Sequence, residues 1–198
     1  MAFELPKTVE GNAKLTKARL GYPNLLRARE NMQGDLQYDC ALYILADDAQ
    51  KAAIDAEVLR VATEKWKEKA QSVLDSIEGN TNKMCWVDGK RKSMPGYWVL
   101  STKRKITEGA PTVVDNDHNP KAGRPHVLTE RDPRPYAGCH VNATVKIWAW
   151  DNSSGKGISC TLVGVQFHSD GDAFSSAPMA SDEGFEDLTT GADAGSLV

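Results

Sequence analysis

The sequence has no apolar run that approaches the roughly 18 residues needed to cross a membrane, so neither a spanning helix nor a membrane partner is expected. The N-terminus lacks a charged lead followed by an apolar stretch, which is the pattern of a secretory signal peptide. The four cysteines contain no Cys-x-x-Cys pair and are widely spaced, at Cys40, Cys85, Cys139 and Cys160. Without a secretion signal, reduced and mostly buried thiols are favoured over disulfides or a metal site, and the expected compartment is the cytoplasm.

Patterns of catalytic sites are also missing. There is no phosphate-binding glycine loop, no Gly-x-Ser-x-Gly and no His-Glu-x-x-His. The four histidines lack the spacing of metal ligands. The Asp-Gly-Asp at residues 170–172 indicates a turn rather than an acidic metal pair. The sequence therefore predicts a protein that is not an enzyme and that needs no cofactor.

Positive charge is absent from the C-terminal end. Residues 170–198 contain seven carboxylates and no Lys or Arg, whereas residues 1–169 contain 24 Lys and Arg against 20 Asp and Glu. The net charge of −3 thus combines a body of +4 with a tail of −7. This asymmetry favours a polyanion-binding body with an interaction tail; an ordinary solvated terminus is the alternative. We predict one folded domain over residues 1–169 and a disordered acidic tail over residues 170–198.

Hydrophobic periodicity predicts short strands with one helical region between them. Alternating apolar residues predict strands over residues 14–20, 36–45, 97–105, 141–150 and 157–167. We expect Gly21 and Pro23 to end the first strand, and residues 151–156 to join the last two as a hairpin loop. The prediction is an α+β fold, mainly β, built as a small barrel.

The helical region follows the second strand. Asp47 or Asp48 is a suitable N-cap for a stretch that runs to about Ile77, as one long helix or as two joined helices. Residues 108–137 hold five prolines, and we expect them to form a long loop without regular structure.

The most informative segment predicts an aromatic surface. Lys146, Trp148 and Trp150 fall on one face of the predicted strand, and the small apolar residues between them fall on the other. Two exposed indoles can stack on nucleic-acid bases, which contributes about 1–3 kcal/mol per base with little sequence preference. The alternative is that both indoles lie beneath the helix or the proline-rich loop.

Basic residues interleaved with aromatic ones point to the same chemistry. Ammonium and guanidinium groups along one groove would follow the phosphates of a nucleic acid, although any single cluster can be plain solvated surface. These further candidate binding residues are Lys17, Arg19, Tyr97, Trp98, Lys103, Arg104, Lys105, Arg134 and Tyr136.

An ordered set of motifs resembles a known family, the OB-fold single-stranded DNA-binding proteins of tailed phages (the Enterobacter-phage Enc type). The motifs span about residues 10–175 in the family's order. They are KLTKARLGY (14–22), YDCALYIL (38–45), VVDNDHNP (113–120), YAGCH (136–140), ATVKIWAWDN (143–152), GKGISCTLVGVQ (155–166) and DG (170–171).

The resemblance implies a five-stranded OB barrel with a helical insertion, no cofactor, and a role in phage DNA replication or recombination in the infected host. It also implies that aromatic residues at the positions of Trp148 and Trp150 belong to the binding face. The chain departs from the family in its longer tail, which carries Asp182, Glu183, Glu186 and Asp187. Similar tails in other single-strand binders recruit replication proteins but usually end on an aromatic residue, whereas this chain ends on Val198.

The leading hypothesis is a sequence-independent single-stranded DNA-binding protein, with or without self-association. Its tail would contact phage or host replication proteins. A phage structural or assembly protein built on a β-barrel, without nucleic-acid binding, is the alternative from another class. A nuclease or recombination enzyme is disfavoured by the missing acidic metal cluster.

Overall fold

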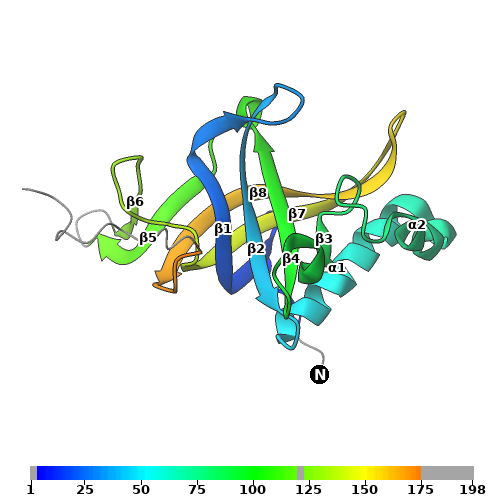
Figure 1. Ribbon diagram of the computed structural model, residues 1–198, viewed down its shortest axis with the longest axis horizontal. Coiled ribbons are helices and arrows are strands. Elements are labelled where there is room, and N and C mark those ends of the chain that lie inside the picture. The colour runs from blue at the N-terminus through cyan, green and yellow to red at the C-terminus, as the bar shows by residue number, and fades with distance from the viewer. Residues whose placement is uncertain (1–3, 120–122, 175–198) are drawn as a thin grey trace, which may run out of the picture.

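The computed structural model describes residues 4–119 and 123–174 (Figure 1). The strands are β1 (Ala13–Glu30), β2 (Leu36–Leu45), β3 (Trp86–Asp88), β4 (Tyr97–Lys105), β5 (Thr112–Asn119), β6 (Arg124–Val127), β7 (His140–Asn152) and β8 (Gly155–Ser169). The helices are α1 (Ala49–Trp66) and α2 (Ala70–Ile77), with short 3₁₀ turns η1 (Lys67–Lys69), η2 (Gly89–Lys92) and η3 (Ile106–Glu108). The predicted α+β class, mainly β, is confirmed.

All eight described strands belong to one sheet, in the order β3-β4-β2-β1-β7-β8-β5-β6. Strand β4 pairs additionally with β8, through Lys103 and Thr161. The pairings from β4 through β2, β1, β7 and β8 therefore return to β4. The helices and the β5–β6 pair lie at opposite sides of these strands (Figure 1).

The prediction that Gly21 and Pro23 end the first strand is wrong, because β1 continues to Glu30. Its pairing with β2 shifts register between Gly21 and Asn24 and again before Arg29, so the strand bends rather than stops. Such irregularities admit residues that a regular ladder excludes, including a proline with no N–H to donate. By contrast, β2 and β4 have the predicted bounds.

The prediction of a structureless loop over residues 108–137 is also wrong. Strand β5 pairs in parallel with β8, with Thr112 opposite Gly164, and β6 pairs antiparallel with β5. The partner of β5 is distant in the chain, so its pairing leaves no local pattern. The β7–β8 connection is also shorter than predicted, because the strands extend to Asn152 and begin again at Gly155.

The helical region forms two helices joined by η1. The side chain of Asp48 accepts a hydrogen bond from the backbone N–H of Gln50, which confirms the predicted cap. α1 buries Ile54, Val58 and Val61 against the sheet's inner face. The part of the chain that the structure describes contains no helix that is long and apolar enough to cross a membrane.

The core consists of the inward-facing residues of the curved sheet and the buried face of α1. Leu20, Leu42 and Leu100 occupy directly paired positions on β1, β2 and β4 and are fully buried. Burial of such a side chain contributes about 1.5–3 kcal/mol. The alternation that buries these leucines also directs their neighbours outward, and those neighbours form the surface described next.

Residues 170–174, which the sequence assigns to the tail, lie against the folded body. Arg19 donates to the carbonyl of Asp172 at 2.7 Å, and the N–H of Phe174 donates to the carbonyl of Ala137 at 3.2 Å. We call residues 170–174 the C-terminal strap. The predicted tail beyond it, with Asp182, Glu183, Glu186 and Asp187, lies outside the described residues.

Candidate nucleic-acid interface

The outer face of β7 carries the predicted aromatic surface. Val145 and Ile147 are buried, whereas Lys146 and Trp148 are exposed. The Trp148 side chain is 39% exposed, and its indole N–H donates to Thr161 Oγ1 on β8 at 3.1 Å. Thr161 therefore orients the ring while leaving its surface open to solvent, as a stacking platform requires.

Five residues, one from each of five strands, are paired in series and form a row on the outer face of the sheet. Lys146 on β7 pairs with Thr161 on β8, and Thr161 pairs with Lys103 on β4. Lys103 pairs in turn with Asp39 on β2, and Asp39 with Asn24 on β1. Because directly paired residues share a face of the sheet, the ammonium groups of Lys146 and Lys103 belong to one surface. We call this set the transverse row.

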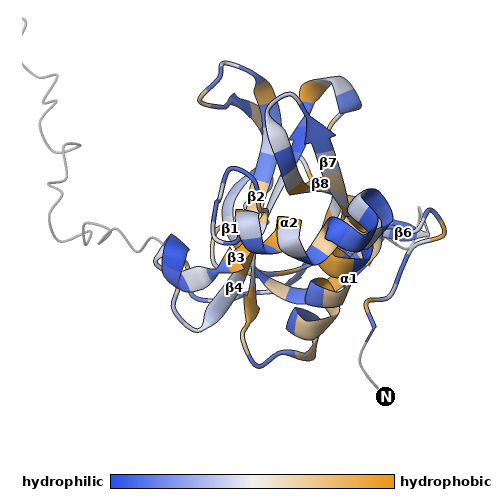
Figure 2. Ribbon diagram, turned by 90° about the vertical axis from the view of Figure 1, so that its right-hand side faces the viewer, coloured by the Kyte–Doolittle hydropathy of each residue, from blue (hydrophilic) through white to orange (hydrophobic). Residues whose placement is uncertain are grey.

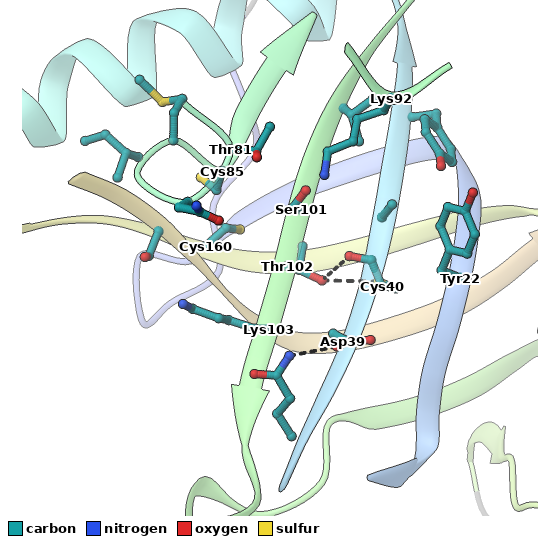
Figure 3. Close-up of a pocket in the computed structure, with 18 of the residues that line it drawn as sticks. Tyr22, Asp39, Cys40, Thr81, Cys85, Lys92, Ser101, Thr102, Lys103 and Cys160 are labelled. Atoms are coloured by element: carbon teal, nitrogen blue, oxygen red, sulfur yellow. Dashed lines mark hydrogen bonds between the residues drawn. The ribbon is translucent and has the colours of Figure 1, made fainter. Parts of the chain in front are cut away.

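A groove of about 300 Å³ lies beside the row on the outer face of β1, β2 and β4. Ala41 and Ser101, a directly opposed pair, lie in it with Ser159 of β8. Figure 3 shows Tyr22 from β1 at one side of the groove, Thr81 and Cys85 at the other, and β2 and β4 between them. Small side chains between taller ones leave room for a flat or extended ligand.

Tyr22 is one of the groove residues that were not predicted from the sequence. Its side chain is 73% exposed and its φ is +47°, a left-handed conformation that is costly for a residue with a Cβ. It lies at the β1 irregularity, which directs its ring away from the core. The neighbouring Gly-Tyr-Pro sequence predicts only a turn, so no local signal identifies an exposed groove residue here.

The carboxylate of Asp39 is held within the transverse row by three residues. Arg29 Nη2 lies 3.0 Å from Asp39 Oδ2, and Asn24 Nδ2 and Gln37 Nε2 donate to the same carboxylate at 2.7 Å each. Asp39 is 8% exposed. Its charge is therefore compensated locally, which limits its repulsion of an anionic ligand.

Trp150 shares the outward face of β7 but is packed more closely. Its ring lies over Gly157, the residue paired with it on β8, and any Cβ at position 157 would lie 2.3 Å from that ring. The absence of a side chain at Gly157 thus allows the indole to lie flat on the strand. Trp150 therefore packs within the β7–β8 hairpin as well as contributing to the outer face of β7.

The two other basic residues at the end of β4 have different environments. Arg104 donates to the carbonyls of Gly109 at 2.7 Å, Glu108 at 2.6 Å and Leu162 at 3.1 Å. Its guanidinium ties η3 and β8 to β4, which leaves fewer donors for a phosphate. Lys105 is exposed and shares the outward face of Lys103.

Three predicted binding residues lie beneath or beside the C-terminal strap. The guanidinium of Arg19 lies 4.5 Å from the ring centroid of Phe174. Tyr136 donates its hydroxyl to Asp170 Oδ1 at 3.0 Å. Arg134 lies 3.7 Å from Asp170 and 4.4 Å from the ring centroid of Phe167. These residues hold the strap in place in this structure.

The strap also reaches the groove. The ring of Phe174 packs edge-on against Tyr43, with centroids 5.4 Å apart, and Tyr43 lines the groove. Gly138 makes this approach possible, because a Cβ there would lie 2.1 Å from the carbonyl oxygen of Asp172. Burial raises the pKa of the Tyr43 hydroxyl. The strap thus ends at one edge of the candidate interface.

The remaining predicted residues are dispersed. Tyr97 packs edge-on against Tyr43, with centroids 6.2 Å apart, next to the groove. Trp98 faces the helices instead and packs against Trp86 at 5.2 Å. Lys17 is exposed with a φ of +51°, and its N–H donates to Asn142 Oδ1 at 3.1 Å. The structure brings Lys146, Trp148, Lys103 and Lys105 to one face, with Arg104 beside Lys146 and Trp148, and places Trp98 elsewhere.

Three buried thiols lie beneath the groove. Burial raises the pKa of Cys40 and of Cys85 to about 12 and that of Cys160 well above its ordinary value. Neutral thiols are poor nucleophiles and poor metal ligands. Among the described residues, no group of three or more His, Cys, Asp or Glu side chains is placed to hold a metal ion.

Comparison with known proteins decides the family. The model of a family described as "Enterobacter phage Enc34, ssDNA-binding protein" matches residues 12–195. The chain belongs to this family. Protein p50 of Acyrthosiphon pisum secondary endosymbiont phage 1 is 38% identical over 179 residues, which is 89% of this chain and 93% of that protein.

Solved structures show the same fold. The single-stranded DNA-binding protein of bacteriophage Enc34 in complex with single-stranded DNA aligns with a TM-score of 0.65 at 20% identity, covering 87% of this chain and 98% of that chain. The gp2.5 single-stranded DNA-binding protein of bacteriophage T7 aligns with a TM-score of 0.53 at 14% identity, covering 89% and 100% of the two chains.

Proposed function

We propose that this member of the Enc34 family binds single-stranded DNA without sequence preference, on the outer face that joins the groove to the transverse row. The observation that carries the proposal is the pairing of Lys146, Thr161 and Lys103 across β7, β8 and β4. It supports one continuous surface on which an aromatic platform and two ammonium groups lie side by side. The family's description names a binding activity and no reaction.

The chemistry of this surface suits a single strand. Bases would stack on Trp148 at one end and on Tyr22 at the other, while Lys103 and Lys146 contact phosphates. Between them, Ala41, Ser101 and Ser159 present little bulk. Stacking and phosphate contacts do not distinguish one base from another, so the binding is indifferent to sequence.

We further propose that the five strands β4, β2, β1, β7 and β8, which pair in that order, form an OB-type barrel that carries this surface. The protein would protect exposed strands during phage DNA replication or recombination, in the cytoplasm of the infected host. Its acidic tail, from residue 175 onward, would contact replication proteins of the phage or the host.

Titration of full-length protein with oligo-dT tests the proposal, with tryptophan fluorescence as the readout. Quenching that saturates, and that a duplex DNA competitor reverses only weakly because its bases are already stacked, is the expected result. An absence of any response, checked by a gel-shift assay, would favour the structural or assembly role. Shortening of the oligonucleotide in the presence of magnesium would favour a nuclease.

A further inference from the structure

A second cleft lies on the helical side of the molecule. Its volume is about 680 Å³, more than twice that of the groove, and it lies between α1, α2 and the β3–β4 pair. Its deepest residues, Val58, Trp86 and Val87, are buried core residues. Figure 2 views the molecule from this side and shows apolar segments of α1 and β3 next to α2.

The walls of this helical cleft expose apolar surface to water. Leu59 of α1 is 44% exposed, and Leu74 of α2 and Trp98 of β4 are partly buried. All three line the cleft. Apolar surface at a concave site of this kind is typical of docking sites rather than of ordinary surface.

An aromatic pair in the cleft is already in contact with a cation. The rings of Trp86 and Trp98 lie 5.2 Å apart, and the ammonium of Lys51 lies 4.3 Å from the Trp98 centroid. Asp55 fixes this arrangement, because it accepts a hydrogen bond from Trp86 Nε1 at 2.8 Å and pairs with Lys51 at 2.7 Å. The cleft therefore offers aromatic faces and carboxylates that suit cationic groups.

The rim of the cleft is acidic, whereas the body of the protein is net positive. Four carboxylates line it, Asp55, Asp75, Glu78 and Asp88, against Lys90, Arg91 and the adjoining Lys51, which pairs with Asp55. In the part of the chain that the structure describes, Asp75, Glu78 and Asp88 have no cation within ion-pair distance. Such a rim repels phosphates and attracts Lys or Arg.

We propose that the helical cleft docks a partner protein through a segment that combines large apolar side chains with Lys or Arg. The apolar side chains would fill the space between Leu59, Leu74 and Trp98, and the basic side chains would face Asp75 and Glu78. The chain's own acidic tail is unsuitable, because residues 170–198 carry seven carboxylates and no cation. The cleft and the groove share only Met84 among their lining residues, so the partner would bind while DNA occupies the groove.

Labelled peptides test this proposal with the full-length protein. The probe is a synthetic amphipathic helix of leucine and lysine, compared with its leucine–glutamate counterpart and with a peptide of residues 175–198. Fluorescence anisotropy should show binding of the lysine peptide. The double variant D75N/E78Q and the single variant L59Q should each weaken this binding at least about tenfold.

A matched control separates a site from general charge. The double variant D47N/E68Q also removes two exposed carboxylates on the helical side, but neither lines the cleft, so it should leave peptide affinity unchanged. Oligo-dT affinity should be the same in every variant, and a ternary complex should form. The proposal would be overturned if both double variants weakened peptide binding equally, or if L59Q left the affinity for the lysine peptide unchanged. Tighter binding of either acidic peptide than of the lysine peptide would also overturn it, as would displacement of the lysine peptide by oligo-dT.

Discussion

Lys103 of β4 lies opposite Thr161 of β8, and Thr161 Oγ1 accepts the hydrogen bond from the Trp148 indole at 3.1 Å. The first contact connects strands that are distant in sheet order, since β4 and β8 are separated by β2, β1 and β7, whereas the second joins the neighbouring strands β7 and β8. A single residue, Thr161, thus adjoins both the cation and the aromatic ring. Substitutions on the two sides of it should affect binding of the same DNA strand.

Replacing Trp148 with alanine should weaken oligo-dT binding by about 1–3 kcal/mol, because it removes one stacking platform. The ring is 39% exposed, so the melting temperature should change little. Trp98→Phe is the control, since Trp98 lies in the helical cleft and its replacement should leave affinity unchanged. Anisotropy of labelled oligo-dT measures both, because this signal does not come from the protein's own tryptophans; normal binding by Trp148→Ala would remove this ring from the interface.

Tyr22 allows a prediction that separates binding from backbone strain. Tyr22→Ala and Tyr22→Gly should weaken oligo-dT binding equally, because both remove the exposed ring. The φ of +47° suits glycine better than alanine, so Tyr22→Gly should be the more stable of the two by up to about 1 kcal/mol. Urea unfolding measures the difference. Unequal affinities at equal stability would contradict the assignment of the ring to stacking.

The neighbouring cations of β4 should respond differently to charge removal. Lys103→Gln should reduce the salt dependence of binding by about 0.7 in the log–log slope, the value for one phosphate contact on a single strand. Arg104→Gln should mainly lower stability, because its guanidinium donates to three backbone carbonyls. Titrations at several salt concentrations, with melting curves, distinguish these effects. A larger slope change for Arg104→Gln would reverse the assignment.

The sequence predicts those features of the site and the fold that depend on alternation along one strand or on the chemistry of one side chain. The outward positions of Lys146 and Trp148 follow from alternation along β7, and the Asp48 cap follows from the chemistry of one side chain. The bounds of β2 and β4 were predictable because both strands pair regularly along their whole lengths.

Long-range contacts account for what the sequence did not reveal. Arg104 looks like its neighbour Lys103 in sequence, yet it lies against the carbonyl of Leu162, 58 residues away. Strand β5 forms on an edge of β8 that no local pattern indicates. Tyr22 is exposed through a change of register in β1, and such shifts depend on the partner strands rather than on the residue itself.

Alkaline pH should destabilise the protein through its buried thiols. Burial raises the pKa of Cys40 to about 12 in the folded state, whereas the pKa of a thiol in the unfolded chain is about 8.5. Between these values the folded state keeps a proton that the unfolded state loses, so the free energy of unfolding falls by up to about 1.4 kcal/mol per pH unit for each such thiol. Below this window the contribution is fully present.

Urea unfolding across the lower part of this window checks the prediction. Cys40→Ala should show a shallower loss of stability with rising pH than the wild-type chain, because one buried thiol is gone. Cys40→Ala should also be less stable at neutral pH, since it leaves a small cavity. Identical pH slopes for the two proteins would show that Cys40 does not titrate in this way.

Two truncations should distinguish the strap from the tail beyond it. Ending the chain after Phe174 removes residues 175–198, with five of the seven carboxylates, but keeps the contacts of Arg19 and Tyr136. If the tail competes with DNA for the basic surface, this truncation should tighten oligo-dT binding at low salt, and the gain should shrink as salt screens both contacts. Ending the chain after Ser169 removes the strap as well, so Arg19 and Tyr43 lose their contacts with Phe174 and the melting temperature should fall.

Two outcomes would contradict these expectations. Equal oligo-dT affinities at low salt of the full-length protein and of the variant that ends at Phe174 would exclude competition by residues 175–198. Equal stability of the two truncations would show that the strap contacts contribute nothing to the fold.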